Sequence, residues 1–147
     1  MKPTWVLVCG RSQARLFERK GTEPHLTMVA EFLHPEGRLK EGQISTDRAG
    51  RTFDTVHKVS HSGGRSGSLK GHEEMTFAKV LGDCLKEGIE HRRFGKLYIA
   101  AEKRFSGLLK GELDSRTRTS VTKWIEKDLE KLPEREIMPI LAEDIFP

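Results

Sequence analysis

Apolar and polar positions in the first part of the chain follow the pattern of β-strands separated by glycine. Residues Thr4–Gly10 (TWVLVCG) are apolar and partly β-branched and end at glycine, which predicts a buried strand. Residues Ala14–Gly21 alternate apolar and charged side chains, and we expect them to form its hairpin partner. Residues Leu26–Leu33 predict a third strand, so the chain is expected to begin with a small meander.

A helical pattern appears after residue 71. The apolar residues that gather along one side of this helix are Met75, Phe77, Ala78, Leu81, Cys84, Leu85 and Ile89. Glu73 and Glu74 suit the positive end of the helix dipole, and residues 91–93 (HRR) suit its negative end. Gly95 follows, so the pattern predicts a long helix that ends shortly before it.

The remaining segments alternate between strand and helix patterns. Lys96–Ala101 reads as a central strand, and Arg104–Leu113 as a short helix with its apolar residues inward: Phe105, Leu108, Leu109 and Leu113. Residues Ser120–Leu129 are interpreted as a strand, although their pattern also fits a helix. A closing helix is expected from Pro133, with Pro139 limiting its regularity.

This order of elements predicts a single α/β domain. The mixed β-sheet would be built from an N-terminal hairpin or meander plus crossover strands, with helices packed on the sheet. A long, basic, glycine-rich loop would precede the main helix. The residues expected to build the core are Trp5, Leu7, Leu16, Phe17, Val29, Leu81, Leu85, Tyr98 and Ile99.

Length and composition support a charged domain with a core of ordinary size. The chain has 147 residues, of which 35% are apolar and 33% are charged. No apolar run approaches the roughly 18 residues of a membrane-spanning helix. The N-terminal apolar run is too short for a signal peptide, so we expect a cytoplasmic protein. Cys9 and Cys84 lie in apolar patterns and are expected to be unpaired thiols.

Residues 37–71 differ from the rest of the chain. They contain seven of the 14 glycines, seven lysines or arginines and three acids, an excess of four positive charges that equals the net charge of the whole chain, +4. So long a stretch without apolar periodicity is usually functional or disordered. We expect a flexible loop that is the most mobile part of the chain.

Two motifs in this loop suit an anion. Arg48 and Arg51 could present a pair of guanidinium groups to phosphate or carboxylate. The sequence GGRSGSLKG could form a nest of backbone N–H groups at Gly63 and Gly64, with Arg65 and Lys70 adding charge. The alternative is a surface loop that makes no specific contact. No Gly-Lys-Ser/Thr motif occurs, so the usual nucleotide cradle is absent.

Other chemistries find little support in the sequence. The start HEEMT of the long helix resembles a zinc-protease motif, but Thr76 occupies the position of the second histidine. The other histidines show no ligand spacing, and no catalytic residue is assigned. Trp5 and Trp124 are expected in the core rather than in a base-stacking surface. We therefore expect no metal and no cofactor.

Several motifs occur in the order seen in the bacterial host attachment protein family. They are WVLVCGRSQARLFE, HPEGRLKEGQISTDRAGRTFD, HEEMTFAKVLGDCL and FGKLYIAAEKRFSGLLKGEL. The most specific parts are STDRAGRTFD and the strand-helix segment through Arg104, Phe105 and Leu108. This resemblance covers nearly the whole chain and implies a protein described as required for attachment to host cells.

The order of elements also resembles the central domain of archaeal and eukaryotic class 1 peptide chain release factors. In that domain a basic loop with Gly-Gly-Gln precedes the long helix and assists release of the peptide from tRNA. Here Gly63 and Gly64 occupy the corresponding place, but Arg65 follows instead of glutamine. An arginine is always cationic and cannot orient water as an uncharged amide does. The resemblance therefore implies a loop suited to RNA rather than to hydrolysis.

Three functions follow from these patterns. The main hypothesis is a non-enzymatic module that binds RNA or ribosomes through the cationic loop. The alternatives are a release-factor-like peptidyl-tRNA hydrolase and a host-interaction protein. No membrane partner is expected, and a homo-oligomer stays open.

Overall fold

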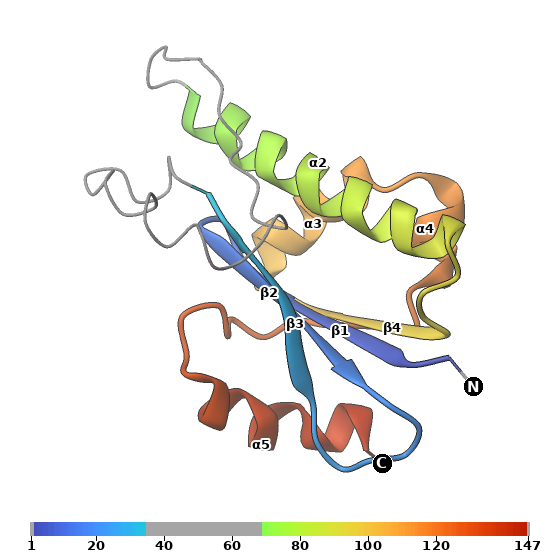
Figure 1. Ribbon diagram of the computed structural model, residues 1–147. Helices are drawn as coiled ribbons and strands as arrows, with labels where there is room; N and C mark the ends of the chain where they lie inside the picture. The colour runs from blue at the N-terminus through green and yellow to red at the C-terminus, as the bar shows by residue number, and fades with distance from the viewer. Residues whose placement is uncertain (1, 35–68, 147) are drawn as a thin grey trace.

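The computed structural model describes residues 2–34 and 69–146, and within them the chain forms a mixed five-stranded sheet (Figure 1). The strands are β1 (Thr4–Cys9), β2 (Gln13–Arg19), β3 (Thr27–Leu33), β4 (Lys96–Ala100) and β5 (Lys123–Ile125), in the order β3-β2-β1-β4-β5. β2 is antiparallel to β1 and β3, whereas β4 is parallel to β1 and β5 is parallel to β4. The predicted α/β fold with an N-terminal meander and crossover strands is confirmed.

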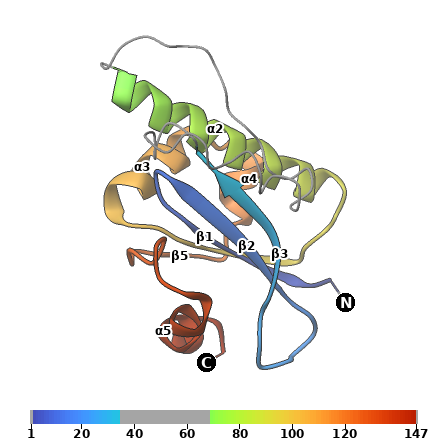
Figure 2. The ribbon, with the colours of Figure 1, turned by 60° about the vertical axis from the view of Figure 1, so that its left-hand side comes forward.

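Helices cover both faces of the sheet. α2 (Leu69–Glu90), α3 (Lys103–Glu112) and α4 (Ser115–Ser120) lie over one face, and α5 (Glu134–Ile145) lies over the other (Figures 1 and 2). Trp5, Leu7 and Cys9 of β1 point to the α2 side, while Val6 and Val8 point to the α5 side. All six residues of β1 are buried, as expected for a central strand with apolar layers on both faces.

The predicted core is confirmed except at one residue. Eight of the nine expected core residues are buried, but Val29 is 39% exposed. In the pairing of β2 with β3, Leu16 lies opposite Ala30 and Phe17 lies opposite Met28, so Val29 is the extra residue of a β-bulge. A bulge interrupts the alternation of side chains along a strand, and here the consecutive residues Met28 and Val29 are both exposed.

The long helix α2 begins at Leu69, three residues before the start that the sequence pattern indicates. Its buried face includes Phe77, Leu81 and Leu85, as predicted, but Met75 is 45% exposed. At 3.6 residues per turn, Met75 lies about 120° around the helix from Leu81 and therefore points to solvent. Its placement in the buried stripe was wrong.

In the C-terminal half, some of the predicted helices and strands are observed and others differ in their bounds. β4 and α3 occupy the expected segments. Of the strand expected over Ser120–Leu129, only Lys123–Ile125 is strand, and the short helix α4 before it was not predicted. Pro133 precedes the first helical residue of α5, and the helix continues through Pro139. α4 escaped prediction because Thr117 is its only buried residue, so it has no apolar periodicity.

Both cysteines are free thiols, as predicted. Burial, with a further contribution from the carboxylate of Glu130, raises the pKa of Cys9. Burial also raises the pKa of Cys84 to about 11, with a smaller effect of Glu87. Titration of the unfolded chain with a thiol reagent is therefore expected to find two thiols. In the folded protein Cys84 should react slowly and Cys9, which is 1% exposed, should not react. A result of no titratable thiol after unfolding would contradict the assignment.

Most of the predicted basic loop, residues 37–71, lies outside the described residues, and the part from Leu69 onward belongs to α2. Within the described ranges, none of the helices has the length and apolar character needed to cross a membrane.

Candidate functional site

Loops converge at the edge of the sheet where the parallel strands end. β1 leads into Arg11 and Ser12, β4 leads into Glu102 and Arg104, and the segment after β5 carries residues 126–132. Such an edge is the usual place for ligands in open α/β sheets. A cavity of about 340 Å³ lies here. We call it the carboxyl-edge site, and its lining residues are Arg11, Glu102, Arg104, Asp128, Glu130, Lys131 and Leu132.

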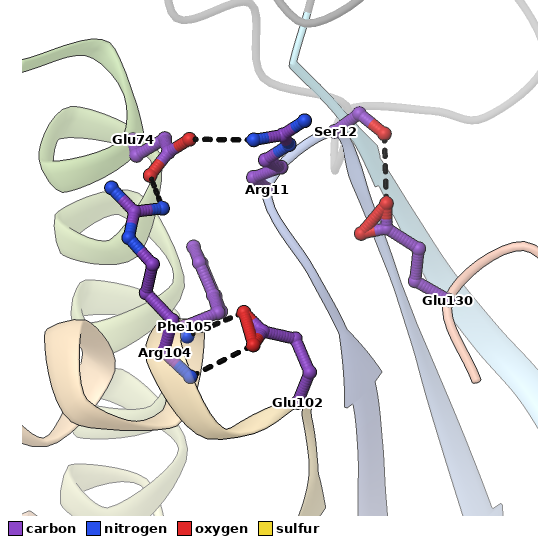
Figure 3. Close-up of polar contacts among 7 residues, drawn as sticks. All are labelled: Arg11, Ser12, Glu74, Glu102, Arg104, Phe105 and Glu130. Atoms are coloured by element: carbon purple, nitrogen blue, oxygen red, sulfur yellow. Dashed lines mark hydrogen bonds and ion pairs between the residues drawn. The ribbon is translucent and has the colours of Figure 1, made fainter. Parts of the chain in front are cut away.

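Two arginines at this site share one buried carboxylate. The Nη1 atom of Arg11 lies 3.4 Å from Oε2 of Glu74, and the Nη1 atom of Arg104 lies 2.5 Å from Oε1 of the same residue (Figure 3). The side chain of Glu74 is only 7% exposed, whereas those of Arg11 and Arg104 are 64% and 59% exposed. A guanidinium group has five N–H donors, so each arginine keeps donors that face water.

The role of Glu74 differs from the one predicted. Because α2 starts at Leu69, its first turn contains no acid and Glu74 lies in the second turn. There it is buried and holds Arg11 and Arg104 rather than interacting with the helix dipole. A buried carboxylate is stable when it is paired and hydrogen-bonded, and here each oxygen has one guanidinium partner.

Glu102 fixes the start of α3. Its Oε1 atom accepts a hydrogen bond from the backbone N–H of Arg104 at 2.8 Å, and its Oε2 atom accepts one from Phe105 at 2.8 Å (Figure 3). This is an N-cap, and it satisfies two N–H groups that would otherwise lack partners. Because Glu102 occupies these groups, the start of α3 offers little to an external anion, and the cap instead positions Arg104.

Glu130 ties the segment after β5 to the turn after β1. Its Oε2 atom accepts a hydrogen bond from the hydroxyl of Ser12 at 2.9 Å (Figure 3). Its backbone carbonyl accepts a second one from the side-chain amide of Gln13 at 2.7 Å. A Cβ atom on Gly10 would lie 1.5 Å from Oε1 of Glu130. Glycine at position 10 is therefore what allows this carboxylate to approach the turn.

The lining of the carboxyl-edge site has equal numbers of cations and acids, but its exposed charged side chains are mostly basic. Two of its lining acids have internal partners, since Glu102 caps α3 and Glu130 bonds Ser12, and the neighbouring Glu74 pairs with both arginines. Among the described lining residues this leaves Arg11, Arg104 and Lys131 against the single acid Asp128. The arrangement can offer several N–H donors to an anion such as a phosphate.

Metal chemistry finds no support in the described ranges. Among residues 2–34 and 73–146, no group of three histidine, cysteine, aspartate or glutamate side chains lies close enough to hold a metal ion.

Most of the residues predicted from the sequence to bind phosphate lie outside the described part of the chain. These are Arg48, Arg51, Gly63, Gly64 and Arg65. Lys70 is the second residue of α2. Both points where residues 35–68 join the described fold are near the carboxyl-edge site. The backbone N–H of His34 donates to the carbonyl of Ser12 at 3.1 Å, and Leu69 precedes Glu74 by about 7.5 Å along the helix.

Sequence reasoning did not single out Arg11, Glu74 or Glu130 as a site, and it noted Arg104 only as part of a motif. For two of these four residues, Arg11 and Arg104, the sequence did contain a signal that points to a site. Arg11 and Arg104 follow closely after two strands that read as buried, and the ends of parallel strands lie at one edge of a sheet.

Comparison with known proteins gives a match to a family model and likenesses among solved structures. A family model described as "Protein required for attachment to host cells" matches residues 5–141. No curated protein matches the chain. Among solved structures, one described as "Archaeal protein" has a TM-score of 0.46 and 13% sequence identity, and the alignment covers 97% of this chain. The chain spans 38% of the length of that protein.

Proposed function

This chain belongs to the family of proteins required for attachment to host cells, and we propose that it acts as a non-enzymatic module that binds RNA by electrostatic contacts. One observation carries the proposal. The exposed guanidinium groups of Arg11 and Arg104 are held side by side on Glu74, next to both points where residues 35–68 join the fold.

Charge supports RNA as the partner. Residues 37–71 carry an excess of four positive charges, and the carboxyl-edge site, whose own charges balance, contributes the exposed N–H donors of Arg11, Arg104 and Lys131. Arginine donors match the geometry of phosphate oxygens, and the phosphate backbone dominates the affinity of most nucleic-acid-binding proteins.

The aromatic residues of the described part argue for backbone contacts rather than base readout. Trp5, Tyr98 and Phe105 are buried in the core and present no stacking surface. Trp124 is partly buried, and the Nζ atom of Lys110 lies 4.8 Å from its ring centroid. Recognition of single-stranded bases relies on exposed aromatic or guanidinium planes. We therefore expect little sequence selectivity and no dependence on a particular base.

The test is binding of a fluorescently labelled single-stranded RNA oligonucleotide, measured by anisotropy. The double variant Arg11→Gln/Arg104→Gln should bind at least about 10-fold more weakly at roughly 0.1 M salt, because two phosphate contacts are lost. The matched control is Lys96→Gln/Arg116→Gln, which removes the same charge at two exposed positions outside the site. The control should bind like the unchanged protein.

Two outcomes would contradict the proposal. Equal losses in both double variants would mean that only net charge matters and that the carboxyl-edge site has no special part. A complete lack of RNA binding at low salt would remove the proposal and favour a direct role in interaction with host molecules, as the description of the family suggests.

A further inference from the structure

A second cavity, of about 690 Å³, lies between α2 and the outer strands β2 and β3. Its lining includes Trp5, Leu16 and Phe32 from the sheet and Val80 and Cys84 from α2, and it shares no residue with the carboxyl-edge site. We call it the α2–β3 groove. Its volume is within the range of small-molecule sites, about 300–1,000 Å³. An apolar floor of this kind gains free energy when an apolar group replaces water.

The floor of the groove is held in place by fixed contacts of Trp5. The indole Nε1–H donates to Oε2 of Glu18 at 3.3 Å, and the ring lies 4.8 Å from the ring of Phe94 at an interplanar angle of 36°. A Cβ atom on Gly88 would lie 2.7 Å from the indole ring, so the absence of a side chain there lets Trp5 pack against α2. A binding surface held in this way needs little ordering when a ligand arrives.

The rim of the groove is negatively charged. Glu18 of β2 and Asp83 and Glu87 of α2 line it, and Arg93 is the one cation among its described lining residues. Asp83 and Glu87 are four residues apart and therefore lie on the same side of the helix. In the described part of the chain neither of them forms an ion pair, so both carboxylates can accept a cationic ligand.

We propose that the α2–β3 groove binds a small organic cation, with an apolar body on the floor and an ammonium group near Glu18, Asp83 and Glu87. The carboxylates attract a cation and repel an anion of the same shape. An uncharged apolar molecule would gain only the contacts with the floor.

The experiment uses the full chain and 4-phenylbutylamine as the probe. Trp5 lines the groove and Trp124 does not, so a Trp124→Phe background makes Trp5 the only fluorophore of its kind. A saturable change in Trp5 fluorescence is expected with the amine. Binding of 4-phenylbutyrate, which has the opposite charge, should be weaker by at least about 10-fold because of the acidic rim.

Removing the negative charges at the rim tests whether the amine binds in the α2–β3 groove. The double variant Asp83→Asn/Glu87→Gln should bind the amine about 5-fold more weakly, as expected for the loss of two largely exposed charge contacts. Glu90→Gln removes one charge from an exposed position of α2 that does not line the groove, and it should leave the affinity unchanged.

The thiol of Cys84 provides a readout that does not depend on fluorescence. Cys84 lines the groove, whereas Cys9 is 1% exposed, so modification of the folded protein reports on Cys84. Saturating amine should slow this modification several-fold, and 4-phenylbutyrate at the same concentration should not.

Three results would overturn the proposal. They are the absence of saturable amine binding, equal affinity for the amine and the acid, and unchanged amine affinity in the rim variant. If saturating amine also leaves the rate of Cys84 modification unchanged, the amine binds elsewhere and the groove is not its site.

Discussion

Replacement of Leu81 by alanine is expected to lower the free energy of unfolding by about 2–5 kcal/mol. Leu81 is 1% exposed and lies in the layer between α2 and the sheet, in one cluster with Leu7 and Phe105. The shorter side chain removes apolar contacts and leaves a cavity that the packed helix and sheet can only partly close.

Denaturant unfolding measures this change, and Met75→Ala provides the control on the same helix. Met75 is 45% exposed, so its truncation should change stability by no more than about 0.5 kcal/mol. A loss below about 1 kcal/mol for Leu81→Ala, or equal losses for the two variants, would show that α2 presents a different face to the sheet.

RNA affinity is expected to fall steeply with salt. If Arg48, Arg51, Arg65 and Lys70 act together with Arg11 and Arg104, six cations contact phosphates. The logarithm of affinity should then fall with the logarithm of salt concentration at a slope of about −4, which is roughly 250-fold between about 50 and 200 mM.

Two sets of substitutions distinguish the contribution of the loop cations from that of the arginines at the carboxyl-edge site. Replacing Arg48, Arg51, Arg65 and Lys70 by alanine should leave a slope of about −1.4, whereas Arg11→Gln/Arg104→Gln should leave about −3. Anisotropy titrations at four or more salt concentrations measure these slopes. A slope that neither set of substitutions changes would mean that the phosphates contact other parts of the surface.

The sequence predicted the elements whose apolar pattern is long or continuous. β1 is buried along its whole length and α2 has a wide apolar face, so both produced a strong signal. Errors arose where burial depended on a local irregularity. The bulge in β3 exposes Val29, and α4 is fixed by a polar cap, in which the Oδ1 atom of Asp114 accepts from the backbone N–H of Thr117 at 2.8 Å.

The carboxyl-edge site was harder to predict because its members are far apart in the chain. Arg11, Glu74, Arg104 and Glu130 come from four separate segments, and only the sheet order brings them together. Each has an ordinary local reading as a surface charge or a helix residue. Glu74 shows the difficulty most clearly, since its position near the start of α2 suggested a dipole interaction and its actual partners are contributed by other elements.

The central place of β1 in the sheet constrains the order in which the chain can fold. On one side Leu7 pairs with Leu16 of β2, its close neighbour in sequence, and on the other side it pairs with Ile99 of β4. The first contact closes a short loop, and the second must close most of the chain at a larger entropic cost. The meander can therefore form early, while the pairing of β4 with β1 is expected to be the slower step of folding. Until then one edge of β1 is open, and the nascent protein is most prone to pairing with other chains during that interval.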